Sequence, residues 1–138
     1  MADKPLLVPE KPLILVVDDS EIVLERVKHR LELEGYRVIT TMQTVGAARH
    51  LKSAALAIID WFMPGISGGE VLESFRAALA NTPVKPLFYL YSSDSSVAMN
   101  AKKIGFDGCF VNKGDDDSLV QQVAAALRIA KLKARSLR

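Results

Sequence analysis

Several side chains that suit phosphoryl chemistry follow short apolar runs of this 138-residue chain. Asp18 and Asp19 follow residues 13–17, Asp60 follows 56–59, Ser92 follows 87–91, and Lys113 comes two residues after 109–111. Three carboxylates brought together would repel one another unless a cation intervenes. Oxygen ligands without His or Cys favour a hard ion, so the donor set predicts Mg²⁺. A lysine and a hydroxyl could hold phosphoryl oxygens, while one carboxylate acts as the nucleophile.

The elements that must position these side chains alternate along the sequence. Apolar runs predict strands at 13–17, 36–41, 56–59, 87–91 and 109–111. Spacing and capping residues predict helices between Ser20 and Gly35, over 44–53, after the Ser67/Glu70 capping box, over 97–104, and from about 115 to 127. The second of these is expected to turn Val45, Ala48 and Leu51 inward. Repeated strand–helix units favour an α/β fold with one parallel sheet covered on both faces.

In an open parallel sheet, ligands bind outside the carboxyl ends of the strands. The five polar residues should therefore meet at one sheet edge, although any one of them taken singly could be an ordinary polar strand end.

Composition bounds the class of protein. With 49% hydrophobic and 25% charged residues, the chain suits one globular domain that is large enough to bury a core. One cysteine excludes an internal disulfide and a thiolate metal cluster. No apolar run approaches the ~18 residues of a membrane span, and residues 1–10 lack a signal-peptide core. We therefore expect a soluble cytoplasmic protein without membrane partners.

The net charge of +2 is unevenly distributed. Residues 1–127 hold 13 basic and 16 acidic side chains, for a net charge of −3. The remaining basic residues lie in the last eleven positions: Arg128, Lys131, Lys133, Arg135 and Arg138. This tail has no interleaved aromatics, so it does not predict a nucleic-acid partner, and a solvated helix extension is the better interpretation.

Three motifs in order carry a resemblance to a known family. They are VVDDS at 16–20, IIDWFMPG at 58–65 with Gly68, and GCFVNK at 108–113. Together they resemble the receiver domain of bacterial response regulators, the phosphorylated half of two-component signalling. The resemblance covers residues 12–127, between a leader (1–11) and a basic extension of the last helix (128–138). It implies a CheY-like, flavodoxin-like, doubly wound five-stranded parallel sheet, in strand order 2-1-3-4-5, with five helices.

The resemblance also implies a role for each site residue. Asp60 would be the phosphoacceptor, and Asp19 would bind Mg²⁺ directly while Asp18 binds it mainly through water. The backbone carbonyl of Phe62 would complete the metal ligands. Ser92 and Lys113 would bind the phosphoryl group, and Phe110 would be the aromatic switch residue. An ordinary aromatic on an edge strand is a nearly equal interpretation of Phe110.

Partners follow from the same resemblance. The phosphoryl donor would be a sensor histidine kinase or a phosphotransfer protein. A downstream protein would bind the face made by the fourth helix, the fifth strand and the fifth helix. A receiver would fill nearly the whole chain, so we expect a stand-alone module, either a monomer or a phosphorylation-linked homodimer.

Two departures from the family pattern matter. Gly114 follows Lys113 where the family usually has proline after a cis bond, so a trans bond is expected here. The hydroxyl position can also be read as Tyr91, Ser92 or Ser93. We prefer Ser92, because Tyr91 belongs to the apolar strand.

Two other functions remain open at this point. One is a degenerate receiver that binds partners without being phosphorylated. The other, less favoured, is an aspartate-based phosphohydrolase, whose nucleophile would follow the first strand with a second Asp two residues later. Here Ser20 and Glu21 follow Asp19.

Overall fold

The computed structural model describes residues 11–136, with side chains through 133, so the expected leader falls almost wholly outside it. Its strands are β1 (Leu13–Val17), β2 (Arg37–Thr41), β3 (Ala54–Ile59), β4 (Phe62–Met63), β5 (Ile66–Ser67), β6 (Leu87–Tyr91) and β7 (Gly108–Phe110). Its helices are α1 (Glu21–Leu33), α2 (Ala48–Leu51), α3 (Gly68–Ala78), α4 (Ser95–Met99), α5 (Ala101–Ile104) and α6 (Asp116–Ser136).

The five longer strands form one parallel sheet in the order β2-β1-β3-β6-β7. Numbered among themselves, these strands have the order 2-1-3-4-5, which confirms the predicted doubly wound topology. The interior strand β1, which lies between β2 and β3, is buried along its whole length, as its unbroken apolar sequence predicts.

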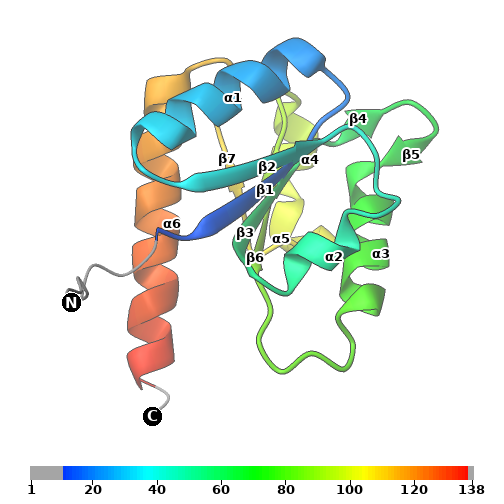
Figure 1. The fold of residues 1–138 in the computed structure, drawn as a ribbon. Helices are drawn as coiled ribbons and strands as arrows, with labels where there is room; N and C mark the ends of the chain where they lie inside the picture. Colours follow the sequence, from blue (N-terminus) through cyan, green and yellow to red (C-terminus); the bar gives the residue numbers. More distant parts are fainter. Residues whose placement is uncertain (1–10, 137–138) are drawn as a thin grey trace.

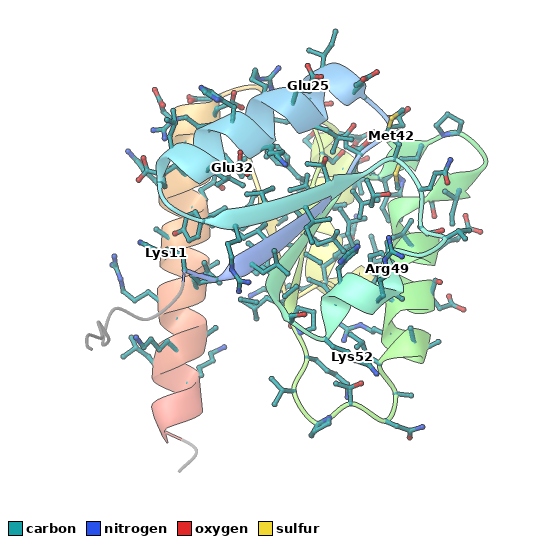
Figure 2. All side chains as sticks on the ribbon, in the orientation of Figure 1. Lys11, Glu25, Glu32, Met42, Arg49 and Lys52 are labelled. Carbon is teal, nitrogen blue, oxygen red and sulfur yellow. The ribbon has the colours of Figure 1, made fainter. Side chains whose placement is uncertain are left out.

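Helices cover both faces of the sheet (Figure 1). On one face, α1 and α6 pack through Leu24, Val27 and Leu119 on inward side chains of β1 and β3. On the other face, α2, α3 and α5 bury Leu51, Phe75 and Ala101 in a second core. The polar side of α1 faces outward, where Figure 2 shows Glu25 and Glu32 pointing away from the sheet.

Capping residues set the starts of the two helices that follow the acidic strand ends. The Ser20 hydroxyl accepts from the Val23 N–H at the start of α1. Ser67 and Glu70 form the predicted capping box at the start of α3. Both caps confirm the sequence interpretation and fix the helices next to the site.

The chain departs from the predicted elements in three places. The second helix begins only at Ala48, after Gly46 with a positive φ, so Val45 is 88% exposed instead of inward. The helix predicted over 97–104 is two short helices, because the Asn100 side chain donates to the Ser96 carbonyl and ends the first. Residues 62–67 form a two-stranded hairpin, β4–β5, where a loop was expected.

The last helix runs without interruption to Ser136, so residues 128–136 continue it as predicted. None of the helices over residues 11–136 is long and apolar enough to cross a membrane.

Gly68, the first residue of α3, lies directly against the backbone of Asp60 and Trp61. A methyl group at position 68 would press into the Asp60 carbonyl oxygen and lie 3.0 Å from the Trp61 Cα, both of which are backbone. Gly68→Ala should lower the free energy of unfolding by about 2–3 kcal/mol, measured by urea denaturation. The control is Gly46→Ala, which has free space and should cost only about 1 kcal/mol for its positive φ. Equal costs for the two variants would contradict this explanation.

Candidate functional site

The parallel ladder brings the acidic strand ends together. The Asp60 N–H donates to the Val17 carbonyl (2.9 Å), and the Asp18 N–H donates to the Thr41 carbonyl (3.2 Å). These bonds extend the β1–β3 and β1–β2 pairings by one residue each. The backbone of both aspartates is therefore held by the sheet.

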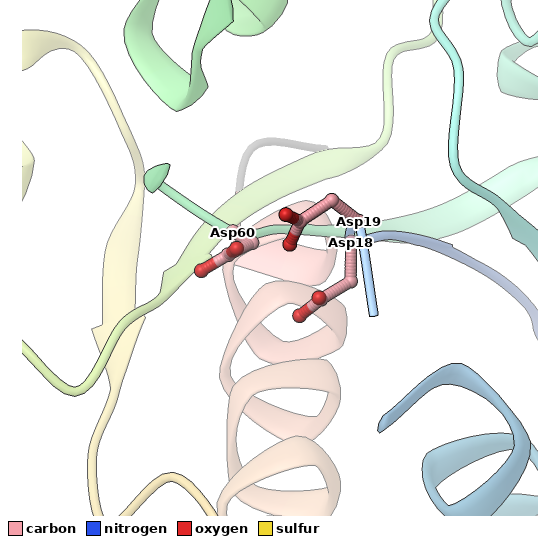
Figure 3. A group of neighbouring side chains, drawn as sticks. All are labelled: Asp18, Asp19 and Asp60. Carbon is pink, nitrogen blue, oxygen red and sulfur yellow. The ribbon is translucent and has the colours of Figure 1, made fainter. Parts of the chain in front are cut away.

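Three carboxylates converge at this edge, as Figure 3 shows. One oxygen from each of Asp18, Asp19 and Asp60 lies within 4.8 Å of the others. Asp18 and Asp60 are buried, at 3% and 7% exposed, whereas Asp19 is more accessible. This is the acidic cluster that the sequence predicts.

Lys113 supplies a positive charge inside the cluster. Its Nζ donates to Asp18 Oδ2 and to Asp60 Oδ1, each at 2.8 Å. Burial lowers the pKa of Lys113, but the hydrogen bonds and charges of the two carboxylates outweigh it, so the pKa is raised. The ammonium group therefore stays charged and bridges strand ends that are far apart in sequence.

The pKa of Asp60 is also raised. Burial is the largest cause, and the charge of Asp18 adds to it, while Lys113 opposes the change. One ammonium offsets only one of three carboxylate charges, so the cluster favours a further cation. Its all-oxygen donors fit Mg²⁺.

Asp18 and Asp19 differ in the oxygens they can offer to an ion. Asp18 Oδ1 accepts from the Ser20 N–H (2.9 Å), and its other oxygen accepts from Lys113. Asp19 borders an open groove of about 480 Å³ that is also lined by Trp61 and Phe62. Phe62, at the start of β4 and two residues after Asp60, is 60% exposed.

The three hydroxyl candidates occupy different places. Ser92 is buried, and its Oγ accepts from the Asp94 N–H (3.1 Å). Ser92 and the exposed Ser93 both line a second groove with Lys113, of about 450 Å³. The Tyr91 hydroxyl instead accepts from the Gly114 N–H (3.3 Å). The structure thus brings Ser92 to the same end of the sheet as Lys113.

Phe110 lies in the hydrophobic core. It is 1% exposed, and its ring stacks on Tyr89 with centroids 4.4 Å apart. It sits on the edge strand β7, but α6 residues pack in the same core. The residue is therefore buried, and it does not line the groove beside Lys113.

Comparison with known proteins identifies the family. The family model described as "Response regulator receiver domain" matches residues 14–124. The chain belongs to this family. It is 29% identical to the phosphate regulon transcriptional regulatory protein PhoB of Rhizobium meliloti, over 87% of this chain and 54% of that protein. It is 33% identical to the transcriptional regulatory protein PrrA of Mycobacterium bovis, over 89% of this chain and 49% of that protein. The receiver chain thus spans about half the length of these curated relatives.

Solved structures show the same fold. The response regulator TrrA of Thermotoga maritima, solved in complex with Mg²⁺-BeF, is 29% identical with a TM-score of 0.67, over 83% of this chain and 97% of that one. The chemotaxis response regulator CheY4 of Vibrio cholerae has a TM-score of 0.68 at 23% identity, over 83% and 98% of the two chains. The flavodoxin-like, CheY-like fold expected from the motifs is confirmed.

Sequence reasoning missed one contact in this receiver, the bond between Tyr91 and Gly114. A signal was present, because a tyrosine ending an apolar strand is buried and its hydroxyl then needs a partner. The sequence alone does not say which partner that is.

The raised pKa of Asp60 predicts a pH-dependent gain from Asp60→Asn. A carboxyl whose folded pKa exceeds the unfolded value of about 3.9 weakens the fold as pH rises through the folded pKa. In buffer with EDTA at pH 7, the variant should be more stable by about 1–2 kcal/mol in urea denaturation. The gain should shrink as the pH falls through the raised folded pKa and should be largely lost below about pH 4, where the carboxyl is protonated in both states.

Lys113→Met is the opposite case, because it keeps the aliphatic stem and removes the charge between the carboxylates. It should lower the free energy of unfolding at pH 7 by about 3 kcal/mol. If both variants shifted stability in the same direction, the charge balance described here would be wrong.

Proposed function

We propose that this receiver is a cytoplasmic phosphoacceptor module in which Asp60 takes a phosphoryl group from a sensor histidine kinase or a phosphotransfer protein. The observation that carries the proposal is the position of Lys113 Nζ, 2.8 Å from Asp60 Oδ1 and from Asp18 Oδ2, in a buried acidic cluster. That arrangement provides a nucleophile, a fixed cation and further oxygen ligands at one point.

The proposed step is a simple displacement. An ionised Asp60 oxygen attacks the phosphorus of a phosphohistidine, the P–N bond breaks, and the imidazole leaves with its electron pair and takes up a proton. Asp18, Asp19, Asp60 and the Phe62 carbonyl would hold Mg²⁺, which supplies positive charge beside the phosphoryl oxygens. Both Asp18 oxygens already accept hydrogen bonds, which supports a water-mediated role for it and a direct one for Asp19.

The proposed switch begins at Lys113 and Ser92. New negative charge on Asp60 would draw the ammonium and the Ser92 hydroxyl, which border the same groove. Movement of the residues after β6 would then reach Phe110 through the core that it shares with Tyr91. Phe110 is the residue that we propose changes position in the two-state transition.

The proposed output surface comprises α4, α5, β7 and α6. Met99 and Val111 are 86% and 50% exposed on it, beside the groove that Lys113 lines. Apolar side chains so placed would give a downstream protein, or a second receiver, a face that responds to the site.

Asp60 should become phosphorylated when the purified protein is incubated with Mg²⁺ and acetyl phosphate. Intact-protein mass spectrometry should show one phosphoryl adduct, which is absent in Asp60→Asn and in samples with EDTA. A folded wild-type protein without any adduct would favour the degenerate receiver. Rapid turnover of a general phosphomonoester would favour the phosphohydrolase.

The fluorescence of Trp61 should report metal binding, because it is the only tryptophan and adjoins Asp60. Titration with Mg²⁺ should change its emission, and beryllofluoride should change it again. Asp19→Asn should weaken the Mg²⁺ affinity about tenfold or more, through loss of a carboxylate ligand. Asp117→Asn, with the same charge change on a side chain that is 84% exposed, should leave the affinity unchanged.

A further inference from the structure

The segment that carries Lys113 is a tight turn of unusual conformation. The Asp115 N–H donates to the Asn112 carbonyl (2.9 Å), so Lys113 and Gly114 are the two central residues. Gly114 has φ +107°, and Asn112 has φ +61°. A positive φ at the third position of a turn suits glycine, and proline with φ near −65° cannot adopt it. Every described peptide bond is trans, as expected for Lys113–Gly114.

The buried Tyr91 side chain contacts this turn from the side of the hydrophobic core. The side chain is 2% exposed, and its hydroxyl accepts from the Gly114 N–H at 3.3 Å. Lys113 Nζ lies 5.4 Å from the centre of the Tyr91 ring, within range of a cation–π contact. Burial raises the pKa of Tyr91, so the hydroxyl remains neutral near pH 7.

We propose that Tyr91 is a positioning residue for Lys113: its hydroxyl holds the turn through the Gly114 N–H, and its ring lies beneath the ammonium. Proline has no N–H, so this bond exists only because residue 114 is not proline. A lysine stem has several rotatable bonds, and fixing its backbone reduces the number of positions that Nζ samples. The inference rests on the proposed function, since it assigns Tyr91 to the action of Lys113 on Asp60.

Tyr91→Phe tests the hydroxyl alone, because it keeps the ring. The maximal rate of Asp60 phosphorylation by acetyl phosphate should fall about three- to tenfold, the effect of one lost hydrogen bond. The concentration of Mg²⁺ giving half the rate should not change, because the acidic cluster is intact. Hydrogen exchange of the Gly114 amide, followed by NMR, should become faster. This exchange measurement needs no phosphorylation.

Tyr89→Phe is the matched control. Tyr89 lies two residues earlier on β6, and its hydroxyl makes no hydrogen bond among residues 11–136. This variant should keep the wild-type rate and the wild-type exchange at Gly114. Thermal unfolding of both variants shows whether a lower rate reflects loss of the fold.

A double-mutant cycle decides whether Tyr91 acts through Lys113. In a Lys113→Ala background, Tyr91→Phe should cause no further loss of rate. An equal loss in both backgrounds would overturn the proposal, as would unchanged exchange at Gly114. If the wild type accepts no phosphoryl group but the exchange result holds, the phosphoacceptor function fails while the contact between Tyr91 and the turn stands.

Discussion

The ammonium of Lys113 between Asp18 and Asp60 is the interaction on which the rest of the site depends. Two buried carboxylates side by side would be costly, and an ammonium 2.8 Å from each compensates them. The compensation is incomplete, because one ammonium offsets only one of the two carboxylate charges and Asp19 adds a third nearby. A site left short of positive charge in this way favours a cation. The phosphoryl group that we propose for Asp60 is itself negative, so it would add to the need for that cation and for Lys113.

The sheet makes this arrangement possible at little local cost. Parallel pairing places the ends of β1 and β3 next to each other, and the ladder bonds from Asp60 to Val17 and from Asp18 to Thr41 hold both backbones. Gly68 lets α3 begin directly against the Asp60 carbonyl. The backbone of Asp60 is therefore held by β1 on one side and by the start of α3 on another. Asp19 and the exposed Phe62 line the open groove next to it.

Much of this could be predicted from the sequence, for identifiable reasons. Fully apolar runs indicated the buried strands. Because ligands bind at the carboxyl ends of parallel strands, the sequence also predicted that Asp18, Asp60 and Lys113 lie close together. The errors arose where local signals compete: Gly46 delays α2 and leaves Val45 in solvent, and the Asn100 amide breaks the fourth helix. The β4–β5 hairpin was missed because strands of two residues have no periodicity to detect. Which oxygens Lys113 contacts depends on side-chain geometry that spacing does not encode.

The residue at position 114 decides what role Tyr91 can have beside Ser92 and Ser93. With proline after the lysine, a tyrosine at the end of β6 would lack this backbone donor for its hydroxyl. With glycine, the turn has a positive φ and also a backbone N–H, and this N–H donates to the Tyr91 hydroxyl. Gly114 and Tyr91 therefore act together. Glycine lacks the ring that would restrict the backbone after Lys113, and the hydrogen bond to the buried Tyr91 hydroxyl restrains that backbone instead. Ser92, one residue later on the chain, is left to face the groove beside Lys113.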